Sequence, residues 1–418
     1  MAVLGIIAEF NPLHNGHLHL LQEAHNHAEF DATVCVMSGN FLQRGDPAIC
    51  NKWARTEMAL QSGIDLVIEL PFSFAVRSAY YFARGAIQLL TRTGVVTHLA
   101  FGSETGNIDT LKSLSTIIAN EPEKYKSLLK QYLSQGFNFP SARSRALQSL
   151  VGGNPNEIRD LLVMPNNILA LEYLRVIEKE YTPLTPITIA RTDSGYHSTH
   201  LSRYASASAI RNTLVNNQSI KLIETAMPAH CLSILEREML SGRAPVLVNS
   251  MAQSILVKLR TMPIEQLRNI YEISEGLEYR IKQAASSCGT VDELKQAIKS
   301  KRYSFTRINR ILLYSLCDLC KTQVEQLDEY GPSYVHVLGF SSKGQKILQE
   351  IKNKSRLVVF NRGGDVKNAY IKGKNTVLGK MLALDTLATD IYTLLYPEPS
   401  HRKGALDFTT SPIKIDRD

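Results

Sequence analysis

Long apolar runs are missing from this sequence, which excludes several classes of protein. No stretch of the 418 residues approaches the roughly 20 consecutive apolar residues that a membrane-spanning helix needs. The strand-like run after Met1 has no basic segment before it, so no secretory leader is expected. Internal repeats and low-complexity segments are also lacking. We therefore expect a globular protein that stays in the cytoplasm and has no membrane partner.

Cysteine is scarce, and its scatter argues against a disulfide framework. Reduced thiols suit such a pattern in a long chain better. Cys317 and Cys320 form one CxxC inside an apolar helical pattern. Because no second pair completes a metal site, this spacing favours core packing over zinc or redox chemistry. The six cysteines are Cys35, Cys50, Cys231, Cys288, Cys317 and Cys320.

Acidic residues are outnumbered, although only moderately. The chain has 47 Lys and Arg against 39 Asp and Glu, which gives a formal charge of +8. Such a balance favours a polyanionic partner without proving one, since excess lysine also keeps proteins in solution. The length favours two domains.

The segment from Val3 to Leu20, VLGIIAEFNPLHNGHLHL, reads as a strand, a turn and a helix. Pro12 breaks the strand, and apolar residues return at helical spacing after Gly16. His14 and His17 therefore lie one turn apart at a helix N-terminus, where free N–H groups and the dipole favour an anion. Surface histidines in a turn are the alternative. Zinc is less favoured, since no Cys or carboxylate nearby completes a tetrahedral set.

Strands and helices then alternate to about residue 190, which indicates an α/β fold with a Rossmann-like parallel sheet. Ligands of such sheets bind beyond the carboxyl ends of the strands. The turn at Pro12–His17, the loop Ser38–Gly45 and the Gly102-Ser103 turn all fall on that edge. Arg191 leaves the strand Pro186–Ala190 towards it as well.

Two further clusters on this edge suit anionic ligands. Arg44 could clamp a carboxylate or phosphate, or could instead cap a loop carbonyl. In the segment Ser206–Arg211, SASAIR, Ser206 and Ser208 at a helix start would offer hydroxyls, and Arg211 one turn on would add charge. Helix capping alone explains one serine but not the pair with Arg211.

Past about Asn217 the alternation stops and helical periodicity dominates, so we place a boundary there: residues 1–217 and 218–418. Helices are expected at 220–240, 249–259, 264–273, 277–287, 291–298 and 308–323, and a small α/β element at 334–360. Basic residues that include Lys301, Arg302 and Arg307 surround Tyr303 and Phe305. They could follow a phosphate backbone and stack a base, or form a solvated face over two core aromatics.

The motifs together resemble a known family. FNPLHNGH after a first strand is similar to the HIGH-type nucleotidyltransferases. MSGNFLQRGDPAICNKWART (37–56), DLVIELP (65–71), FGSE (101–104), PNNILALEY (165–173) and SASAIR (206–211) resemble the bacterial tRNA(Met) cytidine acetate ligases. Asp46 stands where that family commonly has Glu, and Met164 and Ala190 stand where it commonly has Lys.

The resemblance implies an ATP-dependent ligase. Acetate would attack the α-phosphate of ATP to give acetyl-adenylate, and the wobble cytidine of elongator tRNA(Met) would then be acetylated to N4-acetylcytidine. It implies that charge on the phosphates is met by His14, His17, Ser206, Ser208 and Arg211. Nucleotide contacts are expected from Ile7, Ala8, Glu9, Phe10, Asn11, Pro12, Leu13, His14, Asn15, Gly16, His17, Leu18, Leu20, Gly102, Ser103, Asn167 and Arg191.

Other parts of the site follow less directly. Arg44 is the candidate for acetate, and Lys301, Arg302 and Arg307 are candidates for tRNA. Mg²⁺ would bridge the phosphates, carried mainly by ATP because the sequence shows no carboxylate cage, and no metal site of the protein's own is expected. A general base for the cytidine amine is not identified: Asp46, Glu69 and Glu104 are candidates, each equally a structural residue.

Two rival functions remain at this point. An adenylyltransferase that moves AMP onto a small phosphorylated metabolite would share the HxGH turn and the serine loop, but would leave the basic helical half without a role. A nucleotide-dependent RNA-binding module without catalysis is the other. Alanine at His14 and His17 separates them, because a pure RNA binder would keep its affinity.

Overall fold

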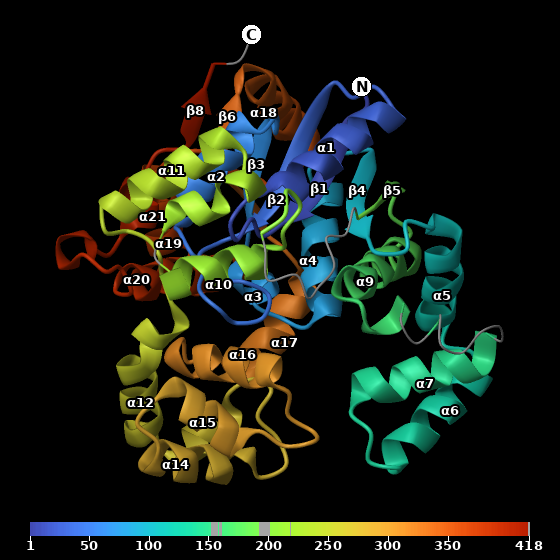
Figure 1. The fold of residues 1–418 in the computed structure, drawn as a ribbon, viewed down its shortest axis with the longest axis vertical. Helices are drawn as coiled ribbons and strands as arrows, with labels where there is room; N and C mark the ends of the chain where they lie inside the picture. Colours follow the sequence, from blue (N-terminus) through green and yellow to red (C-terminus); the bar gives the residue numbers. More distant parts are fainter. Residues whose placement is uncertain (152–157, 159–160, 192–200, 218, 417–418) are drawn as a thin grey trace.

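A computed structural model describes residues 1–151, 158, 161–191, 201–217 and 219–416. Within them the strands form one eight-stranded sheet with the order β5-β4-β1-β2-β3-β6-β7, and β8 pairs with β6 beside that path. Figure 1 shows this sheet in the upper part of the molecule, with helices around it. The strands are β1 (Val3–Ala8), β2 (Ala32–Ser38), β3 (Leu66–Leu70), β4 (His98–Ser103), β5 (Thr185–Ala190), β6 (Tyr334–Ser341), β7 (Val358–Phe360) and β8 (Ile413–Ile415).

The strands β5, β4, β1, β2 and β3 run parallel, as the alternation of strands and helices predicts. β1 lies in the middle, paired with β2 from Val3↔Ala32 to Ala8↔Met37. Every residue of β2 and β3 is buried, which is typical of parallel strands covered on both faces. The Rossmann-like core is thus confirmed, and its carboxyl edge gathers the ends of β1, β2 and β4.

The C-terminal strands belong to this same sheet. β6 pairs antiparallel with β3, with Leu66 opposite Phe340, and β7 and β8 pair parallel with β6. The small α/β element expected at 334–360 is therefore an extension of the first sheet. Its strands complete an apolar edge that β3 alone would leave open. The boundary at 217/218 stays a prediction, and residue 218 lies outside the described residues.

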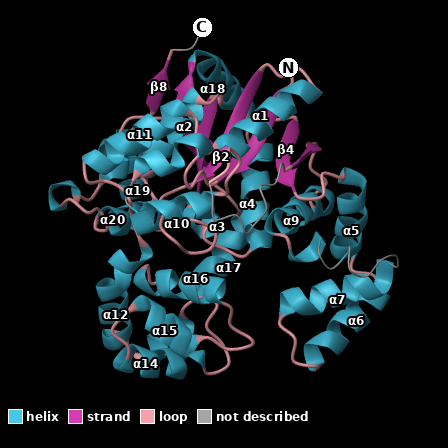
Figure 2. Cartoon of the chain, in the orientation of Figure 1, coloured by secondary structure: helices cyan, strands magenta, loops and turns pink. Residues whose placement is uncertain are grey.

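Helices supply most of the remaining chain, and Figure 2 shows how they surround the sheet. Before β6 they are α1 (Asn15–His27), α2 (Lys52–Gln61), α3 (Phe72–Ala75), α4 (Ala79–Arg92), α5 (Ile108–Asn120), α6 (Glu123–Ser134), α7 (Phe139–Val151), α9 (Pro165–Lys179), α10 (Ala207–Asn217), α11 (Ala229–Leu240), α12 (Ala252–Thr261), α13 (Ile264–Asn269), α14 (Leu277–Ser287), α15 (Val291–Ile298), α16 (Phe305–Leu316) and α17 (Lys321–Tyr330). After it come α18 (Ser342–Lys354), α19 (Gly363–Lys372), α20 (Val377–Thr393) and α21 (Leu406–Thr409), and short 3₁₀ turns lie at η1 (Ile220–Ala226), η2 (Val248–Met251) and η3 (Pro399–His401).

Two groups of helices lie below the sheet in Figure 1. Helices α12, α14, α15 and α16 form one group, which we call the helical lobe, and α6 and α7 form the other. The core of the helical lobe continues into that of the sheet, because Leu259, Ile281 and Ile311 share one apolar cluster with β2 and β3. The mainly helical character predicted after residue 217 is confirmed for residues 219–330.

Several predicted helices are shorter than expected, for local reasons. The helix predicted at 308–323 ends at Leu316, because Asp318 has a positive φ of 51°, and Cys320 then caps α17. Pro228 similarly ends η1 and begins α11. Cys317 is buried and Cys320 partly buried, both as free thiols. The packing interpretation of the CxxC motif therefore agrees with its position.

Membrane-spanning character is absent from the helices that the structure describes. None of them combines the length and the apolarity that crossing a lipid bilayer requires.

Candidate active site

The turn after β1 holds two histidines against a helix N-terminus. Phe10 has a positive φ of 48°, which turns the chain sharply off the strand. His14 then caps α1: its Nδ1 accepts a hydrogen bond from Gly16 N at 3.0 Å. In return, His14 N donates to Nδ1 of His17 at 3.2 Å. The two side chains thus form a capping box made of histidines.

These hydrogen bonds determine the tautomers. A neutral imidazole whose Nδ1 accepts must carry its proton on Nε2, so both histidines keep one N–H donor for a ligand. Burial, assisted by the charges of Arg191 and Arg211, lowers the pKa of His14 to about 3. Burial and the neighbouring His14 and Arg191 place the pKa of His17 well below its usual value. At neutral pH the site therefore offers two uncharged donors.

Packing fixes the position of both rings. Their centroids lie 4.0 Å apart, and Phe10 packs edge-on against His17 at 5.0 Å. Gly16 is required here because a Cβ would lie 2.8 Å from Cε1 of His14. A side chain at that position would push the imidazole out of its capping geometry.

The second phosphate motif lies against this turn. Arg211 Nη1 donates to the carbonyl oxygen of Asn11 at 2.7 Å, and Nη2 donates to Oγ of Ser208 at 3.2 Å. Ser206 caps α10 by accepting from Ala209 N at 3.2 Å. The structure thus brings together the two motifs that the sequence places about 190 residues apart. Ser206 is a capping residue, whereas Ser208 is exposed and orients the guanidinium.

Asn15 binds the turn to the two segments that flank α10. Its Nδ2 donates to the carbonyl oxygens of Arg203 and Thr225, at 3.0 and 2.9 Å. Asn11 contributes through Oδ1, which accepts from Ile49 N at 2.7 Å. The side chains of both asparagines thus bind the chain itself, and the turn is rigid before any ligand arrives.

The end of β4, the strand paired with β1, carries further polar residues of the same edge. Ser103 Oγ lies 2.7 Å from Thr188 Oγ1 and accepts from Gly106 N at 2.9 Å. The peptide of Arg191 donates to the Ser103 carbonyl at 3.0 Å, and its side chain passes over Gly102, 3.6 Å from where a Cβ would lie. Because the charge of Arg191 acts on both histidines, it lies on the same edge.

Asn167 has a supporting position. It is 2% exposed, and its Oδ1 accepts from the peptides of Glu104 and Thr105 at 2.9 and 3.2 Å. Glu104 reciprocates: one carboxylate oxygen accepts from Asn167 N at 2.7 Å and the other from Asn166 N at 3.1 Å. The carboxylate therefore occupies the N-terminus of α9, and both side chains hold the β4 turn in shape.

The remaining residues predicted for the turn are mostly framework. Leu13 is fully buried and Ala8 is 9% exposed, and both belong to the apolar cluster that α10 joins through Ile210. The other framework residues are Ile7, Pro12, Leu18 and Leu20, all buried or partly buried. Their backbone, rather than their side chains, shapes the turn.

The loop after β2 is a hairpin whose tip is held from two sides. Leu42 N donates to the Asp46 carbonyl at 2.9 Å, and Gly45 at the tip has a φ of 85°. Glu9 Oε1 accepts from Gln43 N at 2.7 Å on one side. On the other side, Asp46 Oδ1 accepts from Nδ2 of Asn309 on α16 at 3.0 Å. We call residues 42–46 the hairpin tip.

Gly45 shows how closely the hairpin tip approaches the helical lobe. A Cβ on it would lie 2.7 Å from the backbone nitrogen of Arg310. Arg44, next to it, is exposed, and its charge acts on Glu9, Asp46 and Arg211. The hairpin tip therefore carries an exposed guanidinium whose charge reaches Arg211, and its neighbour Gly45 lies against α16.

Arg55 has a role that its sequence pattern did not indicate, and Glu9 anchors the loop besides being a predicted nucleotide contact. Arg55 is fully buried, and its guanidinium donates to the carbonyls of Glu9, Ser38, Gly39 and Cys50. These four carbonyls come from the ends of β1 and β2 and the loop beyond. Burial raises the pKa of Glu9, against the Gln43 hydrogen bond and nearby arginines that lower it. The position of Arg55 in KWART gives no sign of this, since it reads as one more helical residue.

Several residues of the basic cluster on the helical lobe bind other groups of the lobe itself. Tyr303 is 7% exposed, and its hydroxyl donates to the Ser274 carbonyl at 2.8 Å, so it is a core aromatic and not a stacking platform. Arg307 packs on its ring at 4.6 Å and donates to the Glu272 carbonyl at 2.7 Å. Lys301 and Arg302 are exposed, the latter paired with Glu275, and Phe305 is 37% exposed.

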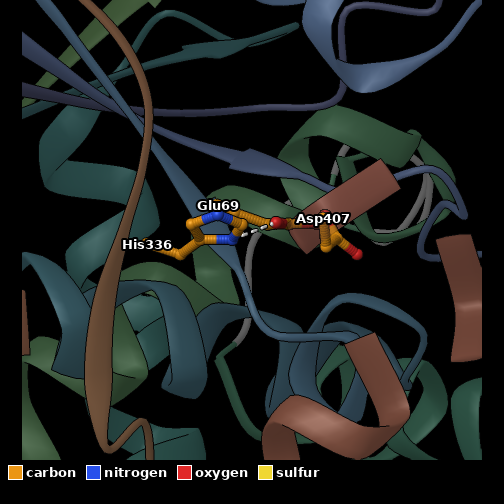
Figure 3. A group of neighbouring side chains, drawn as sticks. All are labelled: Glu69, His336 and Asp407. Carbon is orange, nitrogen blue, oxygen red and sulfur yellow. Dashed lines mark ion pairs between the residues drawn. The ribbon is translucent and has the colours of Figure 1, made fainter. Parts of the chain in front are cut away.

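A buried ionic group lies apart from the histidines, between the sheet and its C-terminal helices. Figure 3 shows Glu69, His336 and Asp407 pointing toward one another, and Nδ1 of His336 lies 2.7 Å from Oε2 of Glu69. These three residues are the one group among the described residues with metal-ligand geometry. Nζ of Lys52, however, lies 2.7 Å from Glu69 and 2.6 Å from Asp407. The ammonium already supplies the cation at this position.

The edge as a whole is suited to a polyphosphate ester. It combines two imidazole donors, a helix N-terminus, and the guanidinium groups of Arg191 and Arg211. The neighbouring carboxylates of Glu9, Asp46 and Glu104 all accept hydrogen bonds from the protein. A phosphate-bound Mg²⁺ would fit this donor set only if ATP supplied most of its oxygens, and it would then neutralise charge on the phosphates.

Known proteins are similar to this chain over nearly its whole length. The family model described as HIGH Nucleotidyl Transferase matches residues 1–407. A tRNA(Met) cytidine acetate ligase of Syntrophomonas wolfei is 58% identical over 413 residues, covering 99% of this chain and 99% of that protein. The corresponding ligase of Halothermothrix orenii is 42% identical over 421 residues, covering 99% and 100%.

Solved structures are similar over the whole chain as well. The apo crystal structure of Thermotoga maritima TmcAL superposes with a TM-score of 0.94 at 36% identity, covering 100% of both chains. The same protein bound with alpha-thio ATP gives a TM-score of 0.92. The fold similarity therefore extends from the HxGH turn to the C-terminal strands.

Proposed function

This chain belongs to the tRNA(Met) cytidine acetate ligases of the HIGH nucleotidyl transferase family, and we propose that it acetylates the wobble cytidine of elongator tRNA(Met) with ATP and acetate. The observation that carries the proposal is the paired N–H donors of His14 and His17 at the N-terminus of α1, with Arg211 bound to the same turn.

The first step needs no nucleophile from the protein. An acetate oxygen attacks the α-phosphorus of ATP, the bond to the bridging oxygen breaks, and pyrophosphate leaves with that electron pair. Negative charge grows on the phosphate oxygens as this happens. Neutral histidines and a fixed guanidinium stabilise that charge without reorganising, because their positions are already set by the protein.

Arg44 is the residue that we assign to acetate. It is exposed at the hairpin tip, and Glu9 and Asn309 fix the residues on either side of it. A guanidinium binds a carboxylate through two parallel hydrogen bonds, so it suits a two-carbon acid that has little else to be recognised by. The charge of Arg44 acts on Arg211, which supports an acetate site next to the phosphate motif.

The tRNA is proposed to lie across the helical lobe. Lys301 and Arg302 are exposed there, and Arg307 is on the first turn of α16. The proposed division keeps residues 1–217 as the ATP-binding part and assigns tRNA binding to the second half, mainly to the helical lobe. With a tRNA as substrate, the cytoplasm is the proposed location.

An adenylyltransferase of a small phosphorylated metabolite remains the second candidate. It would use the same histidines and Arg211 for the same displacement at the α-phosphate. The closeness of α16 to the hairpin tip favours the ligase, because it places a basic lobe beside the nucleotide edge.

The deciding assay supplies purified protein with ATP, labelled acetate and total bacterial tRNA, followed by nuclease digestion and mass spectrometry. We expect label in N4-acetylcytidine, dependent on ATP and independent of acetyl-CoA. The matched control replaces the tRNA with a transcript in which the wobble cytidine is uridine. Pyrophosphate release without labelled tRNA would contradict the ligase assignment, and the acceptor would then have to be sought among small metabolites.

Charge removal on the helical lobe should weaken tRNA binding and leave the rate of acetate activation unchanged. We expect the double variant Lys301→Ala, Arg302→Ala to bind tRNA more weakly. The slope of log affinity against log salt should also become shallower by roughly 0.7 to 0.9 for each phosphate group that the variant no longer neutralises. Filter binding at several salt concentrations measures this.

The matched control for that variant is Lys343→Ala, Lys346→Ala, which removes two exposed lysines of α18, a helix that packs against the sheet. Figure 1 places α18 at the opposite end of the molecule from the helical lobe. An equal loss of affinity in both double variants would mean that only net charge matters, and would contradict the assigned surface.

A further inference from the structure

The second chemical step requires a proton acceptor, and most carboxylates of the site are already engaged. The exocyclic amine of cytidine must lose a proton as it forms the amide bond. Glu69 is buried between Lys52 and His336. Glu104 caps α9 through two peptide N–H groups. Glu69 is thus shielded from solvent and both oxygens of Glu104 are occupied, so these two of the three carboxylates that the sequence suggests have structural roles.

Glu9 is a poor candidate for a different reason. It accepts from the Gln43 peptide, at the end of β1 and on the sheet side of the hairpin tip. Its neighbour Arg55 donates to the Glu9 carbonyl, which fixes the backbone there as well. Glu9 is therefore an anchor for the loop that carries Arg44.

Asp46 lies at the hairpin tip, between the nucleotide edge and the helical lobe. Its carboxylate accepts from Asn309, which is two residues beyond Arg307 on the first turns of α16. Arg44 and Arg211 are close enough for their charges to act on it from the nucleotide side, and Lys295 acts from the helical lobe. The carboxylate thus lies where an RNA base from the lobe would meet an adenylate on the sheet edge.

We propose that Asp46 is the general base of acetyl transfer and takes the proton from N4 of the wobble cytidine. This rests on the proposed function. The N4 lone pair forms the bond to the acetyl carbon, the bond from that carbon to the phosphate oxygen breaks, and AMP leaves with the electron pair. The N4 proton passes to one oxygen of Asp46, while Asn309 holds the other.

The surroundings of Asp46 suit a proton acceptor. Burial raises its pKa, although Lys295, Arg211 and Arg44 lower it in part. A carboxylate whose pKa is raised holds a proton more readily than one with the ordinary pKa. The neighbouring guanidinium groups are also placed to stabilise the AMP that leaves.

The test compares the two half-reactions in Asp46→Asn, whose amide oxygen can still accept from Asn309. Acetate-dependent ATP–pyrophosphate exchange without tRNA reports activation. Single-turnover formation of N4-acetylcytidine from preformed acetyl-adenylate reports transfer. We expect the ratio of transfer to exchange to fall by about 100-fold, the lower range for loss of a general base. Asp46→Glu should restore much of the ratio, because it keeps a carboxylate.

A pH profile separates chemistry from structure. Transfer by the wild type should rise with pH to a plateau, and this ionisation should vanish in Asp46→Asn. The matched control is Asn309→Ala, which removes the hydrogen-bond partner and keeps the base, and should retain the ionisation. The proposal is overturned if the ratio of transfer to exchange in Asp46→Asn equals that of the wild type, whether or not both rates fall. Wild-type exchange without any transfer overturns the proposed function itself.

Discussion

Replacement of His14 by Asn should lower acetate-dependent ATP–pyrophosphate exchange by about 10²- to 10³-fold, on the order seen when one fixed donor to a developing oxyanion is removed. Asn is a good helix cap, so this variant keeps a hydrogen bond to the start of α1 while it removes the Nε2–H. The loss should fall on kcat more than on the KM for ATP, because the donor matters most when charge develops. Steady-state exchange kinetics measure both.

The pH dependence follows from the neutral state of the histidines. With a pKa of about 3 in the folded protein, His14 stays uncharged at pH 5 to 8, so exchange should show no histidine ionisation in that range. In the unfolded chain its pKa returns to about 6.5. The unfolded state therefore binds more protons between about pH 6.5 and 3, and stability should fall as the pH falls through that window.

His27 offers a matched control, because it is exposed at the far end of the same helix. His27→Ala should keep wild-type exchange. If His14→Asn also retained exchange within a few-fold, the histidines would serve only to cap α1. The phosphate would then have to be stabilised by Arg191 and Arg211 alone.

The parts of the site that follow from sequence are those with a local signal. His14 and His17 are predictable at a helix N-terminus because the spacing and Gly16 define a strand, turn and helix within one short segment. The regular alternation up to residue 190 likewise predicts the parallel sheet. Such features depend on neighbours in the chain, so a single sequence carries them.

Features that join distant segments were not predicted, because no local pattern marks them. Arg55 reads as an ordinary helical residue, yet it binds the ends of β1 and β2 through four carbonyls. Tyr303 has the pattern of a base-stacking residue, but its hydroxyl bonds to Ser274 inside the lobe. The pairing of β6 with β3 joins strands that lie far apart in the chain.

The hairpin tip illustrates why residue roles need the tertiary structure. Two interpretations of Arg44 are equally compatible with the sequence, an anion clamp or a loop cap. The structure leaves Arg44 exposed, while Gln43 bonds to Glu9 and Asp46 to Asn309, so the neighbours do the capping. The assignment of acetate to Arg44 stays a prediction. The hydrogen bonds that hold the loop are made by Gln43 and Asp46 instead.

The buried ionic group carries the largest predicted effect on stability. Lys52→Met should lower the free energy of unfolding by about 3–5 kcal/mol, the usual cost when one partner of a buried ion pair is removed. Methionine fills the volume of the lysine stem but leaves Glu69 and Asp407 facing each other without a cation. These residues join α2 and β3 to α21, so the attachment of the C-terminal segment should weaken first. Urea unfolding followed by circular dichroism measures the change.

Two controls define that result. Lys126→Met removes an exposed pair with Glu123 on α6, whose side chains are 52% and 89% exposed, and should change stability by less than about 1 kcal/mol.

Adding zinc or a chelator should leave the wild-type unfolding midpoint unchanged, because Nζ of Lys52 holds the place that an ion would take. A midpoint that rose with zinc would show that Glu69, His336 and Asp407 bind metal in preference to the lysine. A loss below about 1 kcal/mol in Lys52→Met would mean that His336 alone neutralises Glu69 and that Asp407 takes up a proton when the ammonium is gone.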